Sequence, residues 1–106
     1  MINLVMFNAF GLAKITRTQA TVTATAALNE GKAVNRTLIV EFNDPIPSLE
    51  GSEFASISFG AMIQSGKKAR VVVHEFGEKV TEFYKLPQVQ DALHRVLELL
   101  EAAVTN

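Results

Sequence analysis

The two histidines are the side chains in this sequence best suited to acid–base chemistry near neutral pH. His74 falls in a run that alternates as a strand does, and there it shares a face with Arg70. The third group that a catalytic histidine requires is missing, so a sheet histidine beside an arginine is the simpler interpretation. His94 stands three and four residues from Asp91 and Glu98, a spacing that indicates ion pairs on a helix surface, because a metal site would need a third ligand from elsewhere.

Paired carboxylates offer a second route to enzymatic chemistry. Glu50 and Glu53 flank Gly51 in a loop that also contains prolines, and Asp44 is nearby. Two carboxyl groups in different environments can divide acid and base roles, but a glutamate-rich loop is more often simply solvated. The chain has no cysteine, which removes disulfides, thiol catalysis and thiolate metal sites together. We therefore predict a protein that is not an enzyme, with no catalytic, cofactor-binding or metal site.

Basic and aromatic side chains gather in residues 65–85 and form the only candidate binding site. Cationic groups beside exposed rings bind single-stranded nucleic acid through charge and base stacking. Glu75, Glu78 and Glu82 lie in the same segment and cancel much of its positive field. The net charge of −1 also argues against binding by phosphate neutralisation, so nucleic acid is a considered but not a favoured partner. The candidate binding residues are Lys67, Lys68, Arg70, His74, Lys79 and Tyr84.

Length and composition indicate one domain spanning residues 1–106, because domains commonly run to about 100–150 residues. Hydrophobic residues make up 48% and charged residues 20%, a balance compatible with apolar surface buried against a partner or a second copy. The apolar residues 2–7 have no positive charge before them, unlike a signal peptide, and no stretch approaches the about 20 apolar residues of a membrane span. We expect a cytoplasmic protein with no membrane association.

Period-two alternation predicts a sheet for the first half of the chain. Residues 20–28 alternate apolar and hydroxyl side chains, and after a turn at 29–32 residues 33–42 return as the next strand. Residues 2–7 read as a first strand, followed by a break at 8–11 in which Gly11 is free to adopt positive φ. The hydroxyl positions change phase near Gln19, which indicates one strand over 12–28 with a β-bulge in the middle. Residues 43–52 are expected to form an irregular loop.

The second half offers one ambiguous segment and one clear helix. Residues 56–64 alternate as a strand, although 52–65 also fits a helix with Ser52 as N-cap. A turn at 65–68 leads to a strand over 69–76 whose residues 71–73 are expected to be central, then a turn at 77–78 and a strand over 79–85. Pro87 opens the helix, which contributes to the core through Leu93, Val96 and Leu100.

Several segments resemble those of two known families. Residues 38–42, 52–63 and 70–73 look like the strand, helix and strand of STAS-like domains, the modules of anti-sigma-factor antagonists. The resemblance implies that Ser48 or Ser52 occupies the phosphorylation site of that family, although its Asp-Ser-Ser-Gly tetrad is absent. The pair Gly11-Leu12, with Gly66 ahead of a strand, is similar to the phosphocarrier protein HPr, but alanine stands where that family phosphorylates a histidine.

The preferred fold is α+β, an antiparallel β-meander with the C-terminal helix packed on one face. The alternative is an α/β two-layer sandwich, STAS-like or HPr-like, in which residues 17–30 and 52–65 are helices. The preferred function is a small non-catalytic protein-interaction or regulatory module that self-associates, with a homodimer as the expected form. Two alternatives remain: a single-stranded nucleic-acid-binding protein that uses the 65–85 segment, and a STAS-like regulatory domain.

Overall fold

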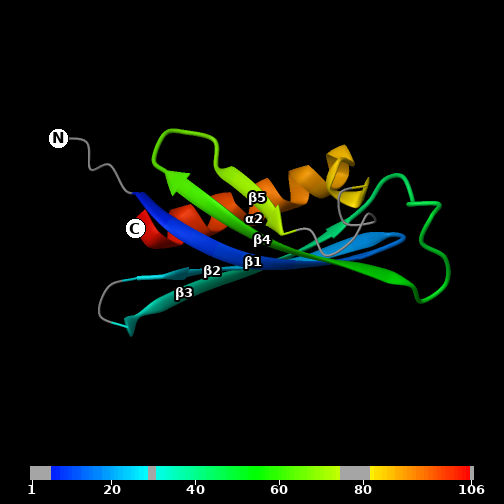
Figure 1. Cartoon of the computed structure of the whole chain (residues 1–106), viewed down its shortest axis with the longest axis horizontal. Coiled ribbons are helices and arrows are strands. Elements are labelled where there is room, and N and C mark those ends of the chain that lie inside the picture. Colours follow the sequence, from blue (N-terminus) through cyan, green and yellow to red (C-terminus); the bar gives the residue numbers. More distant parts are fainter. Residues whose placement is uncertain (1–5, 29–30, 75–81, 106) are drawn as a thin grey trace.

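A five-stranded antiparallel sheet and one long helix make up the described chain. The computed structural model describes residues 6–28, 31–74 and 82–105 (Figure 1). The elements are β1 (Met6–Thr16), β2 (Gln19–Ala27), β3 (Ala33–Glu41), β4 (Phe54–Gln64), β5 (Arg70–His74) and α2 (Pro87–Thr105). The strand order is β3-β2-β1-β4-β5, and every neighbouring pair is antiparallel. The predicted α+β fold is confirmed, with one departure from an uninterrupted meander, because β4 pairs with β1 and not with β3.

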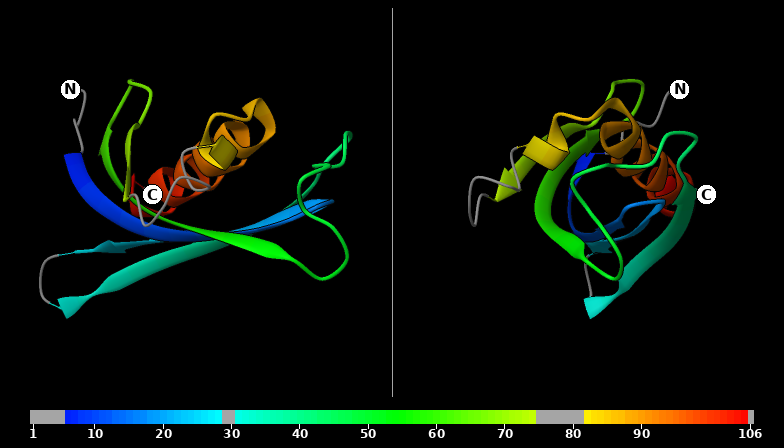
Figure 2. Two further views of the ribbon diagram at one scale, coloured as in Figure 1. Left: turned by 45° about the vertical axis from the view of Figure 1, so that its right-hand side comes forward. Right: turned by 90° about the vertical axis from the view of Figure 1, so that its right-hand side faces the viewer.

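The sheet curls around α2, which lies on its concave face and packs mainly against β2 and β3 (Figure 2). Alternation directs every second residue of each strand to this face: Ile15 of β1, Val22 of β2 and Ile57 of β4 are fully buried. Alanines at positions 20, 24 and 26 of β2 are also fully buried, and their small side chains leave room for the larger ones of the helix. The helix contributes Val89, Ala92, Leu93, Val96, Leu97 and Leu100 to this core.

The segment between β3 and β4 crosses the end of the sheet and closes the core there. The backbone N–H of Ile46 donates to the carbonyl of Arg17 at 2.8 Å, and that of Phe42 donates to Thr18 at 2.8 Å. Ile46 and Leu49 are 3% and 5% exposed, so the crossing segment contributes two side chains to the core. The prediction of an irregular loop over residues 43–52 is confirmed.

The predicted boundaries of the first two strands are wrong. No break interrupts residues 8–11, because β1 runs through Gly11, which is not among the glycines with positive φ. The predicted bulge near Gln19 is instead a reversal of the chain: Thr16 ends β1, and its hydroxyl accepts a hydrogen bond from the Gln19 N–H at 3.2 Å. A tight turn shifts the alternation phase as a bulge does, so the pattern alone did not separate them. Residues 2–5 of the predicted first strand lie outside the described residues.

The alternative fold with helices at 17–30 and 52–65 is wrong. Both segments are largely strands, β2 and β4, and β4 is paired on both sides, with β1 and β5. Pairing on two edges satisfies its backbone groups, and its odd-numbered side chains enter the core, an arrangement that outweighs weak local helix propensity. The STAS-like and HPr-like sandwiches therefore do not describe this protein.

Two further predictions about residues 69–85 fail. Residues 71–73 are not central, because β5 forms an edge of the described sheet. The strand predicted over 79–85 is wrong for residues 82–84, which are helical, with Phe83 buried at 2% exposure. Residues 79–81 and the predicted turn at 77–78 lie outside the described residues. The turn at 65–68 is confirmed, with Gly66 at φ 80°, and so is the helix that begins at Pro87.

Candidate functional site

The predicted binding residues that the structure describes are divided between the two faces of the sheet. Arg70 and His74 share the convex face of β5, because they lie at even-numbered positions of one strand. Lys67 and Lys68 belong to the turn before β5 and line a pocket on the helix side. Tyr84 is half-buried against the core, and Lys79 lies outside the described residues. The hypothesis treated these side chains as neighbours along the chain, whereas the sheet separates them by face.

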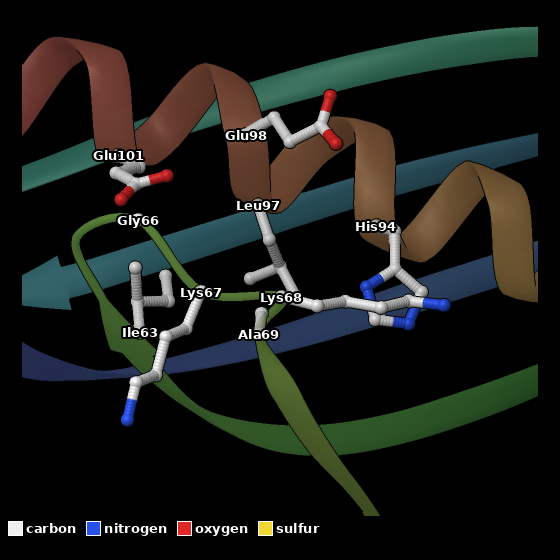
Figure 3. Close-up of a pocket in the computed structure, with 9 residues that line it drawn as sticks. All are labelled: Ile63, Gly66, Lys67, Lys68, Ala69, His94, Leu97, Glu98 and Glu101. Atoms are coloured by element: carbon white, nitrogen blue, oxygen red, sulfur yellow. The ribbon is translucent and has the colours of Figure 1, made fainter.

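The pocket beneath the β4–β5 turn has mixed charge (Figure 3). It measures about 420 Å³ and lies between the turn and α2, where Lys68 extends alongside the His94 ring. Burial lowers the pKa of His94, and the Lys68 charge lowers it further against the opposing effects of Glu98 and Asp91. Burial and the neighbouring Lys68 ammonium together favour the neutral form of the His94 imidazole. The other polar side chains of the pocket are Lys67, Glu98 and Glu101, and the lining includes no hydroxyl or thiol for the imidazole to activate.

The other chemical candidates are dispersed. Asp44, Glu50 and Glu53 are all exposed. On α2, Asp91 pairs with Arg95 at 4.0 Å and not with His94, and exposed pairs of this kind contribute little to stability. Within residues 6–28, 31–74 and 82–105, no three side chains of the metal-binding types gather in one place. In the same ranges, no helix has both the length and the apolar character needed to cross a bilayer.

The convex face of the sheet carries an apolar patch with no element of the described chain over it. We define the open-face patch as Met6, Phe10 and Leu12 of β1, Met62 of β4 and Val72 of β5. Their exposed fractions run from 43% for Met62 to 67% for Met6. Antiparallel sheets with one face packed on the core usually present polar side chains on the other face, so these large exposed apolar side chains are unusual.

Polar side chains surround this patch. The hydroxyls of Thr21, Thr23 and Thr25 continue the open face across β2, and Thr23 is hydrogen-bonded to Thr37 of β3 at 2.9 Å. Toward the other end of β1, the Lys14 ammonium lies 4.5 Å from the centre of the Phe54 ring. The open face thus carries an apolar patch with polar side chains beside it, and both kinds of side chain are common at protein interfaces.

Sequence reasoning missed this patch because both phases of β1 are apolar. Ala9, Ala13 and Ile15 point to the core, whereas Phe10 and Leu12 point to the open face. Two large apolar side chains thus lie outside while two alanines lie inside, opposite to the simplest expectation. The signal present in the sequence was the pair of large apolar residues Phe10 and Leu12 in a segment whose other phase is also apolar.

A hollow lies at the centre of the open-face patch. It measures about 430 Å³, and its floor is Gly60, which is paired with Phe10 on one side and Val72 on the other. A Cβ placed on Gly60 would find its nearest neighbours at 3.8 Å, the His74 Nε2 atom, and at 4.0 Å, the Ala9 carbonyl oxygen. The missing side chain of Gly60 therefore leaves open space on this face of the sheet, and no neighbouring group packs tightly against the glycine.

Comparison with known proteins finds no matching family, no matching curated protein and no matching solved structure. The function is therefore argued from the geometry of the open face.

Proposed function

We propose that this protein is a small non-catalytic interaction module that self-associates through the open face of its sheet. The observation that supports the proposal is the open-face patch, a set of large apolar side chains exposed on a face that the helix does not cover. A second sheet packed on this face would bury them as a β-sandwich does. The regulatory role and the cytoplasmic location expected from the sequence stay predictions.

The size of the patch implies a weak, reversible dimer. Full burial of a Leu, Val, Phe or Met side chain contributes about 1.5–3 kcal/mol, so five partly exposed side chains in each of two copies offer roughly 9–18 kcal/mol. Association itself costs an estimated 4–15 kcal/mol or more, which is of the same size as this gain, so the patch alone does not support a tight dimer. At about 25 cal/mol per Å², the same range corresponds to roughly 400–700 Å² of apolar area, which is below the about 1,200–2,000 Å² of total area buried in stable specific interfaces. We therefore expect a dimer whose population changes with protein concentration.

Single-stranded nucleic acid is the second candidate, favoured by one specific observation. Arg70 and His74 share the open face with Phe10, and stacking of a base on an aromatic side chain is worth about 1–3 kcal/mol. Against it, the turn lysines Lys67 and Lys68 line the pocket on the other side of the sheet, and the chain has a net charge of −1. Self-association needs neither a basic excess nor a cofactor and is the simpler account.

The two candidates are separated by molar mass from light scattering at two protein concentrations, with and without a poly-dT oligonucleotide at low salt. We expect a mass that rises toward a dimer with concentration and does not respond to the oligonucleotide. Leu12→Thr should shift the protein toward monomer, because threonine suits an exposed strand but removes apolar contact area. Ile39→Thr is the matched control, since Ile39 has a similar exposure of 61% on the same face but lies on β3, outside the patch. A monomer at both concentrations, or a salt-sensitive mass increase with oligonucleotide alone, overturns the proposal.

A further inference from the structure

Strands β1 and β4 contain two adjacent glycine–phenylalanine pairs that face opposite sides of the sheet. On the concave face, Gly11 lies directly across from Phe59. On the convex face, the next pair along the register is Phe10 with Gly60. In the first pair the glycine belongs to β1 and the phenylalanine to β4, and in the second pair the assignment is the opposite. Each strand therefore contributes one ring and one glycine. The two pairs differ in whether the phenylalanine ring fills the space left by the missing side chain of the glycine.

The inner hollow is filled by the protein's own ring. The Phe59 side chain lies against Gly11 so closely that a Cβ there would overlap the ring, and Phe59 is only 1% exposed. A glycine in a strand often marks such a close approach by another group. This contact uses the missing side chain of Gly11 to bring a large aromatic ring into the core beneath β1.

The outer hollow is not filled in the same way. No atom of Phe10 comes within 4 Å of the Cβ position of Gly60, although the two residues are direct cross-strand neighbours. The Phe10 ring is instead 62% exposed, beside a hollow of about 430 Å³. An apolar cavity on the order of 150 Å³ is enough to hold a benzene ring, so this hollow has room for a phenylalanine.

We propose that Phe10 of a second copy fills the hollow over Gly60, and that the contact is reciprocal. A two-fold axis parallel to the strands and between β1 and β4 places each Phe10 over the partner's Gly60, because these two residues face each other across that strand pair. Each copy then supplies one ring and receives one. The inference rests on the proposed self-association and specifies the contact at its centre.

The surroundings of the hollow favour a second copy over other occupants. With this axis, Lys14 lies opposite Ser56 of the partner subunit, and Arg70 lies opposite the end of the partner's β2. Neither cation therefore faces another cation across the interface. Arg70 is the one charged side chain that the described residues contribute to the lining of the hollow, which is too little to neutralise a nucleic-acid backbone. Ring and hollow are also side by side on one surface, the self-complementary arrangement that an isologous interface requires.

The test fills the hollow without disturbing the fold. In Gly60→Val, the Cβ meets no atom closer than 3.8 Å, and a β-branched residue suits a strand, so the monomer should fold as the wild type does. We expect its dimer dissociation constant, measured by sedimentation equilibrium, to rise at least tenfold. Phe10→Thr removes the ring from the other side of the same contact and should have the same effect, which keeps the test valid if one variant does not fold. Ile39→Thr is again the control and should dimerise normally.

A swapped variant tests reciprocity directly. Phe10→Gly combined with Gly60→Phe exchanges ring and hollow between the two strands, and it should recover much of the dimer affinity lost in either single variant. A dimeric wild type whose affinity is unchanged in Gly60→Val and Phe10→Thr would overturn this contact while leaving self-association through the open face in place. A wild type that stays monomeric at all concentrations would overturn both, and oligonucleotide binding lost in Phe10→Thr would assign the hollow to a base instead.

Discussion

The same substitution at two glycines of one strand pair should have opposite effects on stability. Gly11→Ala places a Cβ 2.6 and 2.7 Å from the two Cε atoms of the Phe59 ring, and closer still to its Cζ. The ring cannot yield by moving into solvent, because Phe59 is 1% exposed within the core. Gly60→Ala places a Cβ at ordinary contact distance on the convex face.

The expected difference is large enough to measure. Forcing extra atoms into a packed core costs about 1–3 kcal/mol, whereas replacing glycine by alanine in an element interior gains roughly 0.5–1 kcal/mol. Gly11→Ala should therefore lose about 1–2 kcal/mol of unfolding free energy, and Gly60→Ala should be neutral or gain up to about 1 kcal/mol. At about 4–8 °C per kcal/mol for a chain of this size, Gly11→Ala should lower Tm by roughly 4–16 °C.

The assay is urea unfolding at a protein concentration low enough for the monomer to dominate. This condition matters because dimerisation raises apparent stability by mass action, and Gly60→Ala alters the proposed contact surface. The pair serves as its own control, since both variants introduce the same methyl group into neighbouring registers of the same two strands. Equal midpoints for Gly11→Ala and Gly60→Ala would refute the argument that Phe59 occupies the space beside Gly11.

Two further predictions concern α2. Leu97→Asp should unfold the protein, with a loss of more than about 3 kcal/mol of unfolding free energy, because it places an unpaired charge at a position 1% exposed. Leu99→Asp, at a position 45% exposed, should leave the circular-dichroism melt nearly unchanged. Equal melts for the two variants would contradict the observed orientation of the helix. The lowered pKa of His94 means that the unfolded chain takes up a proton more readily than the folded one, so stability should fall as pH drops below about 6.5, and His94→Gln should weaken this dependence in melts between pH 5 and 8. A direct NMR titration should find the His94 pKa below its ordinary value, and Lys68→Gln should raise it; a wild-type value at or above 6.5 would remove the basis for both statements.

Local pattern was sufficient where one element decides the structure. The helix from Pro87 follows from a proline at its first position and from apolar residues at helical spacing, and Leu93, Val96 and Leu100 are buried as predicted. The alternation over 20–28 likewise predicted β2, with alanines and Val22 facing inward. Both periodicities are properties of a single element and can be read without knowledge of its neighbours.

The candidate site could not be predicted in this way, because it depends on which segments meet. Lys68 and Arg70 are two residues apart, yet one lines the pocket under α2 and the other faces the convex side of the sheet. The grouping of basic residues along the chain therefore did not become a grouping in space. Conversely, Phe10 and Gly60 are 50 positions apart and become direct neighbours only because the segment between β3 and β4 crosses the end of the sheet and lets β4 pair with β1.

The sequence by itself determined that a sheet and a C-terminal amphipathic helix are present, with apolar positions enough for one core, but it left residues 17–30 and 52–65 open between strand and helix. Only the tertiary structure decided the strand order, and with it which of the two apolar phases of β1 is buried. The buried face of β1 depends on several elements at once, because α2 covers one face of the sheet and the sheet curves around it. The face that carries the small side chains of Ala9 and Ala13 is the one that is buried. Phe10 and Leu12 are left on the other face by the same choice, and the interaction surface proposed for this protein is its consequence.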